Sequence, residues 1–238
     1  MNIQFLKQSI KAGVASKAFP MQYHEYYKRW KESLDPAHNS VTDRQPWITF
    51  PCIDLLKGKL NQSSTVFEYG GGGSTLFFLD RAGEVVTVEH DGQWFDKLEA
   101  IIRSGNDSSR KWKGNFITPG QLEPGLHPDA SNPDDYFSSD SNFQQHTFKK
   151  YAAKIDEFPP GYFDVVLVDG RARPSCIKHA IPKLKKGGWL VVDNSDREYY
   201  FTHFADQLER SFRLIYNKLN AVPYLGSFSK TGIWEKQN

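Results

Sequence analysis

A short apolar strand that runs into four consecutive glycines and then into a helix constrains the fold of this chain most strongly. The strand is predicted over residues 65–69 (TVFEY), the glycines are residues 70–73, and the helix is predicted over 74–81 (STLFFLDR). Glycines at such a turn let the backbone bend tightly and approach a ligand closely, and the next helix presents free N–H groups. Any tight turn can use glycine, but ordering four in a row costs considerable chain entropy, which favours a binding turn.

Strands and helices alternate from about residue 50 onward. The pattern predicts strands over 84–89, 115–118, 163–168, 189–192, 212–219 and 228–235, and helices over 53–60, 94–103, 143–157, 175–184 and 200–210. Residues 185–188 are predicted to form a turn. This order predicts an α/β fold in which a parallel sheet has helices on both faces, with the last two strands antiparallel.

Composition narrows the class of protein. Thirty basic and 28 acidic residues give the 238-residue chain a net charge of +2, which provides no electrostatic footprint for nucleic acid. Two cysteines exclude a disulfide framework, and no stretch approaches the roughly 20 apolar residues of a membrane span. We therefore expect a cytoplasmic protein that has no membrane span and no nucleic-acid partner; these features leave the oligomeric state open.

The chain is expected to divide near residue 50. Residues 1–50 are predicted to form a helical, aromatic-rich cap, and residues 51–238 the α/β domain, with an insertion at about 119–160 that is rich in proline, serine and aspartate at its start. Within the cap, Ile3, Leu6, Ile10 and Val14 have helical spacing. Such a helix could lie on a membrane surface, or cover the domain or a partner subunit.

Two ligand classes compete for the glycine turn. A dinucleotide fingerprint needs G-x-G-x-x-G/A, but Thr75 stands at the third position when counting from Gly70, and Leu76 when counting from Gly71. An acidic residue two places before the first glycine, here Glu68, suits a ligand with an α-amino group, bound directly or through water.

The second strand ends in Glu89, 21 residues after Glu68. A carboxylate at this position can accept hydrogen bonds from both hydroxyls of a ribose, in dinucleotide folds as well as in others. Glu89 could instead be an ordinary helix cap or a solvent-facing acid. As a ribose ligand it indicates an adenosine-containing cofactor without choosing between the two ligand classes.

Four segments, VFEYGGGGST, VVTVEH, FDVVLVDG and GGWLVVDN, together resemble the class I S-adenosylmethionine-dependent methyltransferases. The resemblance covers roughly residues 50–235 and implies a doubly wound, Rossmann-like, seven-stranded mixed sheet with a C-terminal antiparallel strand pair. It also implies roles at the cofactor: Glu68, Gly70, Gly72 and Ser74 around the methionine, Glu89 at the ribose, and His90 and Asp91 near the adenine.

Asp169 and Asp193-Asn194 follow the fourth and fifth strands, at the edge of the sheet beside the predicted crevice. Their oxygen atoms could bind Mg²⁺ or another divalent cation. This arrangement is similar to the Asp, Asp and Asn of the catechol and caffeoyl-CoA O-methyltransferases. The lysine base of those enzymes is absent, because Ala172 stands three residues after Asp169. In metal-free relatives the two aspartates only polarise or cap the local backbone, and that alternative stays open.

Arg171 and Arg173 flank Ala172. They could clamp a carboxylate or phosphate of the acceptor, or they could pair with nearby acids and only shape the site. Asp169 and Arg171 are the candidate catalytic residues. His127 or His146, from the insertion, could instead supply a base.

The sequence thus predicts transfer of a methyl group from S-adenosylmethionine to a small-molecule acceptor, most readily at oxygen, with Mg²⁺ as a possible second cofactor. Residues 119–142 and the aromatic N-terminal segment are expected to cover the acceptor. Two alternatives remain. One is a nicotinamide-dependent oxidoreductase, and the other is a non-catalytic module that retains the cofactor fold.

Overall fold

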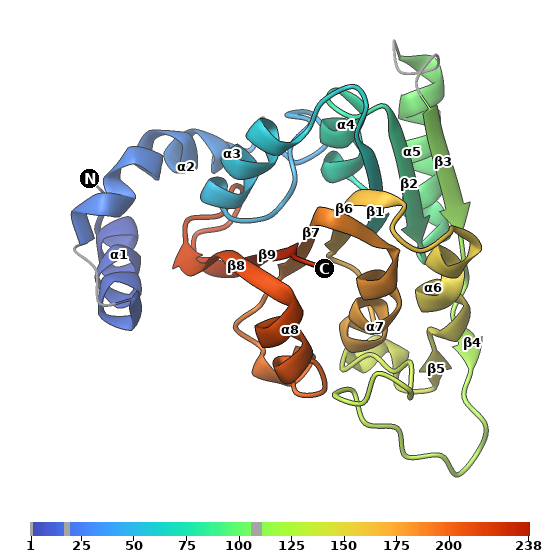
Figure 1. The fold of residues 1–238 in the computed structure, drawn as a ribbon. Helices are drawn as coiled ribbons and strands as arrows, with labels where there is room; N and C mark the ends of the chain where they lie inside the picture. The colour runs from blue at the N-terminus through green and yellow to red at the C-terminus, as the bar shows by residue number, and fades with distance from the viewer. Residues whose placement is uncertain (1, 17–19, 106–110) are drawn as a thin grey trace.

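Seven strands form one mixed sheet in the order β3-β2-β1-β6-β7-β9-β8 (Figure 1). The computed structural model describes residues 2–16, 20–105 and 111–238. The first five strands in this order are parallel, whereas β9 runs antiparallel to both of its neighbours, β7 and β8. The strands are β1 (Thr65–Tyr69), β2 (Glu84–Glu89), β3 (Lys111–Phe116), β6 (Phe163–Val168), β7 (Leu184–Asp193), β8 (Phe212–Asn220) and β9 (Ser229–Lys236). The predicted fold class is therefore confirmed.

Helices cover both faces of the sheet, because successive strand residues point to opposite sides. On β1, Val66 belongs to the core beneath the helices α3 (Phe50–Lys59), α4 (Gly73–Leu79) and α5 (Gly92–Ser104). The next residue, Phe67, belongs to the core beneath α6 (Lys149–Ala153), α7 (Arg173–Lys183) and α8 (Ala205–Ser211). The strands β1 and β6 are buried on both faces, which explains why their sequences are mostly apolar.

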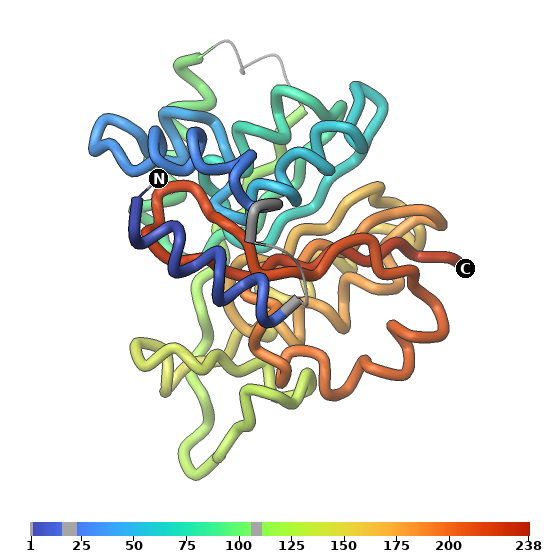
Figure 2. Tube along the Cα trace, turned by 90° about the vertical axis from the view of Figure 1, so that its left-hand side faces the viewer, coloured from blue at the N-terminus to red at the C-terminus, as the bar shows by residue number. Residues whose placement is uncertain are grey.

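The N-terminal residues form α1 (Ile3–Ser16), a 3-10 helix (Pro20–Tyr26) and α2 (Tyr27–Ser33). Helix α1 lies alongside β8, in front of the C-terminal strands in Figure 2. It contacts the domain through Phe5, whose ring centroid is 5.2 Å from that of Phe228. The predicted helix is confirmed, but the apolar stripe singled out in the sequence faces outward: Ile3, Leu6, Ile10 and Val14 are all exposed. No helix in the described part of the chain is long and apolar enough to span a bilayer.

The predicted helix over 143–157 is wrong in its first half. The segment instead contains a 3-10 turn (Ser141–Phe143), strand β5 (His146–Thr147) paired with β4 (Gly120–Gln121), helix α6 and a second 3-10 turn (Lys154–Glu157). Phe143 and Phe148 lie edge-on to the His90 ring, with centroids 5.2 and 5.7 Å away. Packing against His90 thus determines the positions of Phe143 and Phe148, which a continuous helix would place differently.

Three other boundaries also differ from the prediction. The third strand is Lys111–Phe116 rather than 115–118, and its first residue pairs with Glu84. The alternating lysines Lys111 and Lys113 make the start of this edge strand polar, so its sequence did not indicate a strand. Lys113 pairs with Glu84 on the neighbouring strand, with an Nζ–Oε1 distance of 2.6 Å. The expected turn at 185–188 lies within β7, and the expected helix over 200–210 is replaced by a 3-10 turn (Glu198–Tyr200) and α8.

The segment Ser40–Gln45 packs directly onto the start of α4. A Cβ atom on Gly73 would lie 2.0 Å from the carbonyl oxygen of Ser40 and 2.5 Å from that of Gln45. Arg44 ties the same segment to the end of this helix, with its Nη2 2.8 Å from Asp80 Oδ1 and 3.2 Å from the carbonyl oxygen of Leu76. Only glycine permits this close backbone contact.

We therefore expect Gly73→Ala to lower the free energy of unfolding by about 1–3 kcal/mol, the usual cost of overpacking. Gly58→Ala is the matched control, because a Cβ at Gly58 in α3 meets nothing within 4 Å, and alanine is the better helix former. Urea unfolding of both variants tests this. Equal stability of the two variants would contradict the close packing at Gly73.

Candidate functional site

Glu68 lies beneath the glycine turn, in the middle of the sheet. Its carboxylate is fully buried and accepts hydrogen bonds from Ser74 Oγ (2.7 Å), Thr87 Oγ1 (2.7 Å) and Thr75 Oγ1. Burial raises the pKa of Glu68 to about 7, although the three hydroxyl groups act in the opposite direction. Both carboxylate oxygens are thus engaged inside the protein, and Glu68 does not line the crevice above the turn.

The glycine turn is clamped between two strand ends. Gly70 has a φ of +92°, a backbone conformation that favours glycine, and its N–H donates to the carbonyl oxygen of Val88 at 2.9 Å. A Cβ atom on Gly70 would be 3.2 Å from the backbone of both Asp169 and Gly170. The turn after β1 therefore sits tightly against the turn after β6.

Glu89 closes the other side of this turn. One carboxylate oxygen accepts the backbone N–H groups of His90 (2.6 Å) and Asp91 (2.9 Å), and the other accepts that of Gly71 (2.9 Å). Burial alone would raise the pKa of Glu89, but these hydrogen bonds and the nearby His90 imidazole outweigh burial and lower it. Glu89 is therefore an ionised carboxylate that remains accessible from the crevice.

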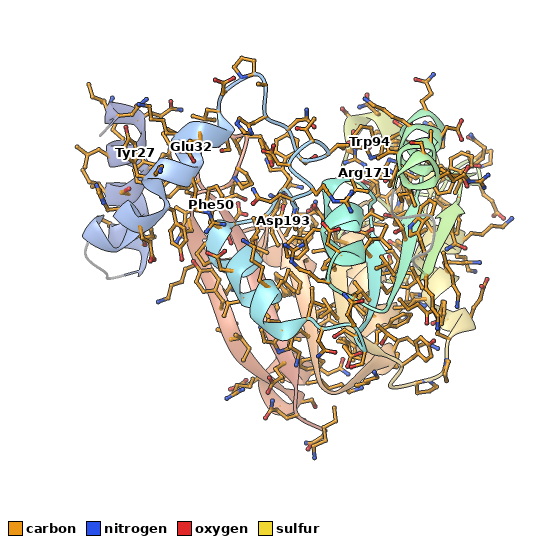
Figure 3. All side chains as sticks on the ribbon, turned by 90° about the horizontal axis from the view of Figure 1, so that it is seen from above. Tyr27, Glu32, Phe50, Trp94, Arg171 and Asp193 are labelled. Carbon is orange, nitrogen blue, oxygen red and sulfur yellow. The ribbon has the colours of Figure 1, made fainter. Side chains whose placement is uncertain are left out.

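The crevice above these residues has a volume of about 260 Å³. Trp94, at the start of α5, forms one wall and donates its indole N–H to the carbonyl oxygen of Gly71 at 2.7 Å. Trp94 and Arg171 lie on the same side of the site, apart from Asp193 (Figure 3). Most predicted site residues meet here, since the lining consists of Ser40, Trp47, Gly70, Gly71, Gly72, Gly73, Ser74, Glu89, His90, Trp94, Asp169, Gly170 and Arg171.

Trp47 and Trp94 are the two large side chains of the lining to which the sequence analysis gave no individual role, and Ser40, Gly71, Gly73 and Gly170 also had none. A signal for Trp94 exists in the sequence, because Asp91 caps the helix that follows β2 and accepts the N–H of Trp94 at 3.0 Å. A side chain in the first turn of that helix must lie near the glycine turn. No comparable signal marks Trp47, whose position depends on how the N-terminal segment folds over the sheet.

A second cavity, of about 360 Å³, adjoins the crevice. It shares Trp47 and Asp169 with the crevice and extends over the ends of β7 and β9. Its full lining is Trp47, Asp169, Asp193, Asn194, Val222, Leu225 and Ser229. Asp169 thus borders both spaces, and a molecule in the second cavity would lie directly beside a ligand in the crevice.

Arg173 bridges the two aspartates that follow β6 and β7. Its Nη2 lies 3.0 Å from Asp169 Oδ1, and its Nη1 lies 3.9 Å from Asp193 Oδ2 and donates to the Asp193 carbonyl oxygen. The guanidinium also donates from Nε to the carbonyl oxygen of Gly170 at 3.0 Å. The Arg173 side chain is only 10% exposed, so this cation is a built-in part of the cluster.

One guanidinium cannot neutralise two carboxylates. Burial and the charge of Asp193 raise the pKa of Asp169, and the guanidinium of Arg173 only partly offsets them. Burial likewise raises the pKa of Asp193, although Arg173 and the hydroxyl of Thr231, 2.8 Å from Asp193 Oδ1, lower it. The two carboxyls therefore hold a proton more readily than isolated aspartates do.

The residues present do not fit the expected divalent cation at Asp169, Asp193 and Asn194. The space between the two carboxylates belongs to the Arg173 guanidinium, whose charge would repel a metal ion. Asn194 turns its amide toward Ser229, with an Nδ2–Oγ distance of 3.1 Å. Within the described ranges, no group of three or more His, Cys, Asp or Glu side chains is placed to hold a metal ion.

Arg171 lies beside the crevice, whereas His127 and His146 of the insertion lie away from it. Arg171 pairs with Asp140 (Nη1–Oδ2 2.9 Å), and its Nε lies 3.4 Å from Nε2 of His90. Both arginines of the 169–174 loop are thus ion-paired with carboxylates. His127 lines separate cavities formed by the insertion, and His146 lies in β5, so neither lines the crevice or the second cavity.

Solved structures share this architecture at low sequence identity. The O-methyltransferase from Bacillus cereus, in complex with SAH, is 14% identical, with a TM-score of 0.54 over 100% of this chain and 92% of its own. A protein from Corynebacterium glutamicum is 12% identical, with a TM-score of 0.55 over 90% of this chain and 97% of its own. No family model and no curated protein matches the sequence. The chain has the class I methyltransferase fold.

The Arg173 bridge predicts that wild-type protein has no saturable Mn²⁺ site here. Arg173→Ala removes the guanidinium and leaves two carboxylates facing each other, so we expect this variant to bind Mn²⁺ in calorimetric titration. Arg213→Ala, on the exposed Arg213–Glu235 pair, is the control and should behave as wild type. Saturable binding to wild type that Asp193→Asn abolishes would show that the metal displaces Arg173.

Proposed function

We propose that this protein transfers a methyl group from S-adenosylmethionine to an oxygen atom of a small-molecule acceptor. The observation that carries the proposal is the ionised carboxylate of Glu89, held at the end of β2 opposite the glycine turn. A ligand placed in this crevice lies beside the second cavity, with Asp169 between the two spaces. The fold of the solved O-methyltransferase supports the same conclusion.

The cofactor would lie along the crevice from the glycine turn to His90. Oε2 of Glu89 has a lone pair left for a ribose hydroxyl, because it accepts only the N–H of Gly71. Oε1 already accepts two backbone N–H groups and lies 2.7 Å from Nδ1 of His90. Gly70 and Gly72 would let the methionine end approach the backbone. Ser74 lines the crevice but gives its hydroxyl to Glu68, so these two residues would support the methionine end through the turn.

A nicotinamide cofactor is the weaker alternative. The third glycine of a dinucleotide fingerprint is replaced by Thr75, whose hydroxyl bonds to Glu68 and accepts the N–H of Gly72 at 3.0 Å. This side chain fills the space that the third glycine would leave for close packing. A non-catalytic module is also disfavoured, since binding a protein partner requires neither a buried Glu68 nor an ionised Glu89.

In methyl transfer the acceptor oxygen attacks the methyl carbon in line with the sulfur. The new O–C bond forms as the S–C bond breaks, the bonding electrons move to sulfur, and the acceptor loses its proton. The protein mainly supplies orientation and a proton acceptor. Asp169 would accept that proton, since it borders both spaces and its side chain is a quarter exposed.

Arg173 and Arg171 would position this base rather than act as one, since arginine stays protonated. Arg173 fixes the orientation of the Asp169 carboxylate, and Arg171 lines the crevice next to it. The raised pKa of Asp169 gives it more affinity for a proton than an ordinary aspartate has. No metal is needed for this step, and the residues present do not fit one.

We expect wild-type protein to bind S-adenosylmethionine and S-adenosylhomocysteine, and not NAD, in calorimetric titrations. Glu89→Gln should weaken S-adenosylhomocysteine binding about 10- to 100-fold, the scale of hydrogen bonds to a charged group. Glu99→Gln, which breaks a surface pair with Arg103 on α5, is the matched control. Unchanged affinity in Glu89→Gln would remove Glu89 from the cofactor site, and binding of NAD alone would overturn the proposed function.

The raised pKa of Asp169 predicts a pH dependence. The carboxylate is the active form, so kcat should rise with pH along a limb centred well above the pKa of 3.8 typical of aspartate. Asp193→Asn removes the neighbouring negative charge, lowers the pKa of Asp169 and moves this limb to lower pH. Release of S-adenosylhomocysteine with an acceptor found by screening measures kcat, with the exposed Asp206→Asn as control. A limb that stays fixed in Asp193→Asn would exclude Asp169 as the base.

A further inference from the structure

We propose that a third cavity, lined by three arginines, binds an oxyanion group of the acceptor, either a carboxylate or a phosphate. The inference rests on the proposed function, because it identifies the class of molecule that receives the methyl group. The cavity has a volume of about 460 Å³ and lies between residues 130–140 of the insertion, the start of α7 and the loop after β7. Such a volume suits a small molecule.

The charges around this cavity favour an anion. Arg171, Arg173 and Arg197 line it, whereas Asp140 is the only acidic residue in its lining. Arg171 is paired with Asp140, and Arg173 with the two aspartates behind it. Within the described part of the chain, Arg197 has no carboxylate partner, and its Nη1 donates only to the hydroxyl of Tyr200 at 2.8 Å. Arg197 therefore supplies the uncompensated positive charge at the rim.

Helix α7 adds a further donor. This helix has 11 residues and starts in the cavity wall, with Ala172, Arg173 and Pro174 among the lining residues. Ala172 has no side chain that could cap the helix, and the first turn contains no acidic residue. Pro174 has no N–H group, so the helix contributes the backbone N–H of Arg173 and the positive end of its dipole to a wall that already contains guanidinium groups, which favours an anion.

The cavity also has the polar groups that orient an anion. The hydroxyls of Ser139 and Tyr199, 2.9 Å apart, connect the insertion to the loop after β7 across the cavity. Guanidinium groups bind carboxylates and phosphates through two parallel N–H donors, and the rim arginine keeps most of its N–H groups available.

The position of the cavity links this anion to the methyl transfer. Gly170 and Arg171 line both this cavity and the cofactor crevice, so the two spaces share a wall. The methionine end of the cofactor would lie at the glycine turn, and no residue of that turn lines the arginine cavity. We therefore assign the anion to the acceptor, whose hydroxyl would extend past Gly170 into the crevice beside Asp169, rather than to the carboxylate of the cofactor.

Inorganic phosphate and benzoate serve as probes, titrated separately into the full-length protein at constant ionic strength. We expect at least one of them to bind wild type saturably, and Arg197→Gln to bind it at least ten-fold more weakly. Arg213→Gln is the matched control, because Arg213 is an exposed arginine on β8 paired with Glu235. Binding of phosphate alone indicates a phosphorylated acceptor, and binding of benzoate alone indicates a carboxylate.

A kinetic arm tests whether the anion belongs to the acceptor. Hydroxylated aromatic acids, their phosphate-bearing analogues and the corresponding neutral amides are compared as acceptors in S-adenosylhomocysteine release. The preferred anionic acceptor should show at least a ten-fold higher KM in Arg197→Gln with kcat nearly unchanged, while the affinity for S-adenosylhomocysteine stays the same.

Three outcomes would overturn the inference: no saturable anion binding to wild type, equal loss in Arg197→Gln and Arg213→Gln, or a preference for neutral acceptors. Failure of the proposed function is a separate result. It would appear as wild-type protein that binds an anion through Arg197 but binds neither S-adenosylmethionine nor S-adenosylhomocysteine.

Discussion

The buried carboxylate of Glu68 is the interaction on which the rest of the site depends. An ionisable group at the centre of a sheet is costly unless hydrogen bonds compensate its desolvation. Here the compensation comes from hydroxyls on two other elements, Ser74 and Thr75 on α4 and Thr87 on β2. These bonds hold β1, β2 and α4 in register and thereby determine the path of the glycines. The hydrogen bond from Gly71 to Glu89, and with it the shape of the crevice, follows from that path.

The parts that could be predicted from sequence are those with a local signal. The mainly apolar runs at 65–69 and 163–168 predicted the central strands, and the glycines predicted the turn between β1 and α4. The position of Glu89 at a strand end was equally readable. The sequence did not predict that Glu68 points into the interior below the glycine turn, because its three hydroxyl donors come from α4 and β2. The first half of the predicted helix 143–157 failed for a similar reason, since packing on His90 overrides local helical preference.

The Arg173 bridge shows why the sequence left two alternatives open for Asp169 and Asp193, a metal site and pairing with an arginine. The spacing of Asp169 and Arg173 is visible in the sequence, but Asp193 reaches the same point only because β6 and β7 are adjacent and parallel. Two carboxylates brought together by the sheet need a cation between them, which can be a metal ion or an arginine. Arginine neutralises charge but does not activate a hydroxyl as a Lewis acid, so in the proposed reaction a carboxylate would deprotonate the acceptor.

The net charge of this protein gives information about its whole surface but not about the charges in the arginine-lined cavity. A balance of +2 argues against a broad electrostatic footprint for a polyanion. Net charge carries no information about where the charged residues lie. The loops after β6 and β7 bring three arginines to one cavity, whereas Asp169 and Asp193, the partners of Arg173, do not line it. Such an arrangement favours a single concave contact with one anionic group. The selectivity of the site for its acceptor would then come from the three arginines and the insertion, all of which lie outside the four segments that carry the resemblance to methyltransferases.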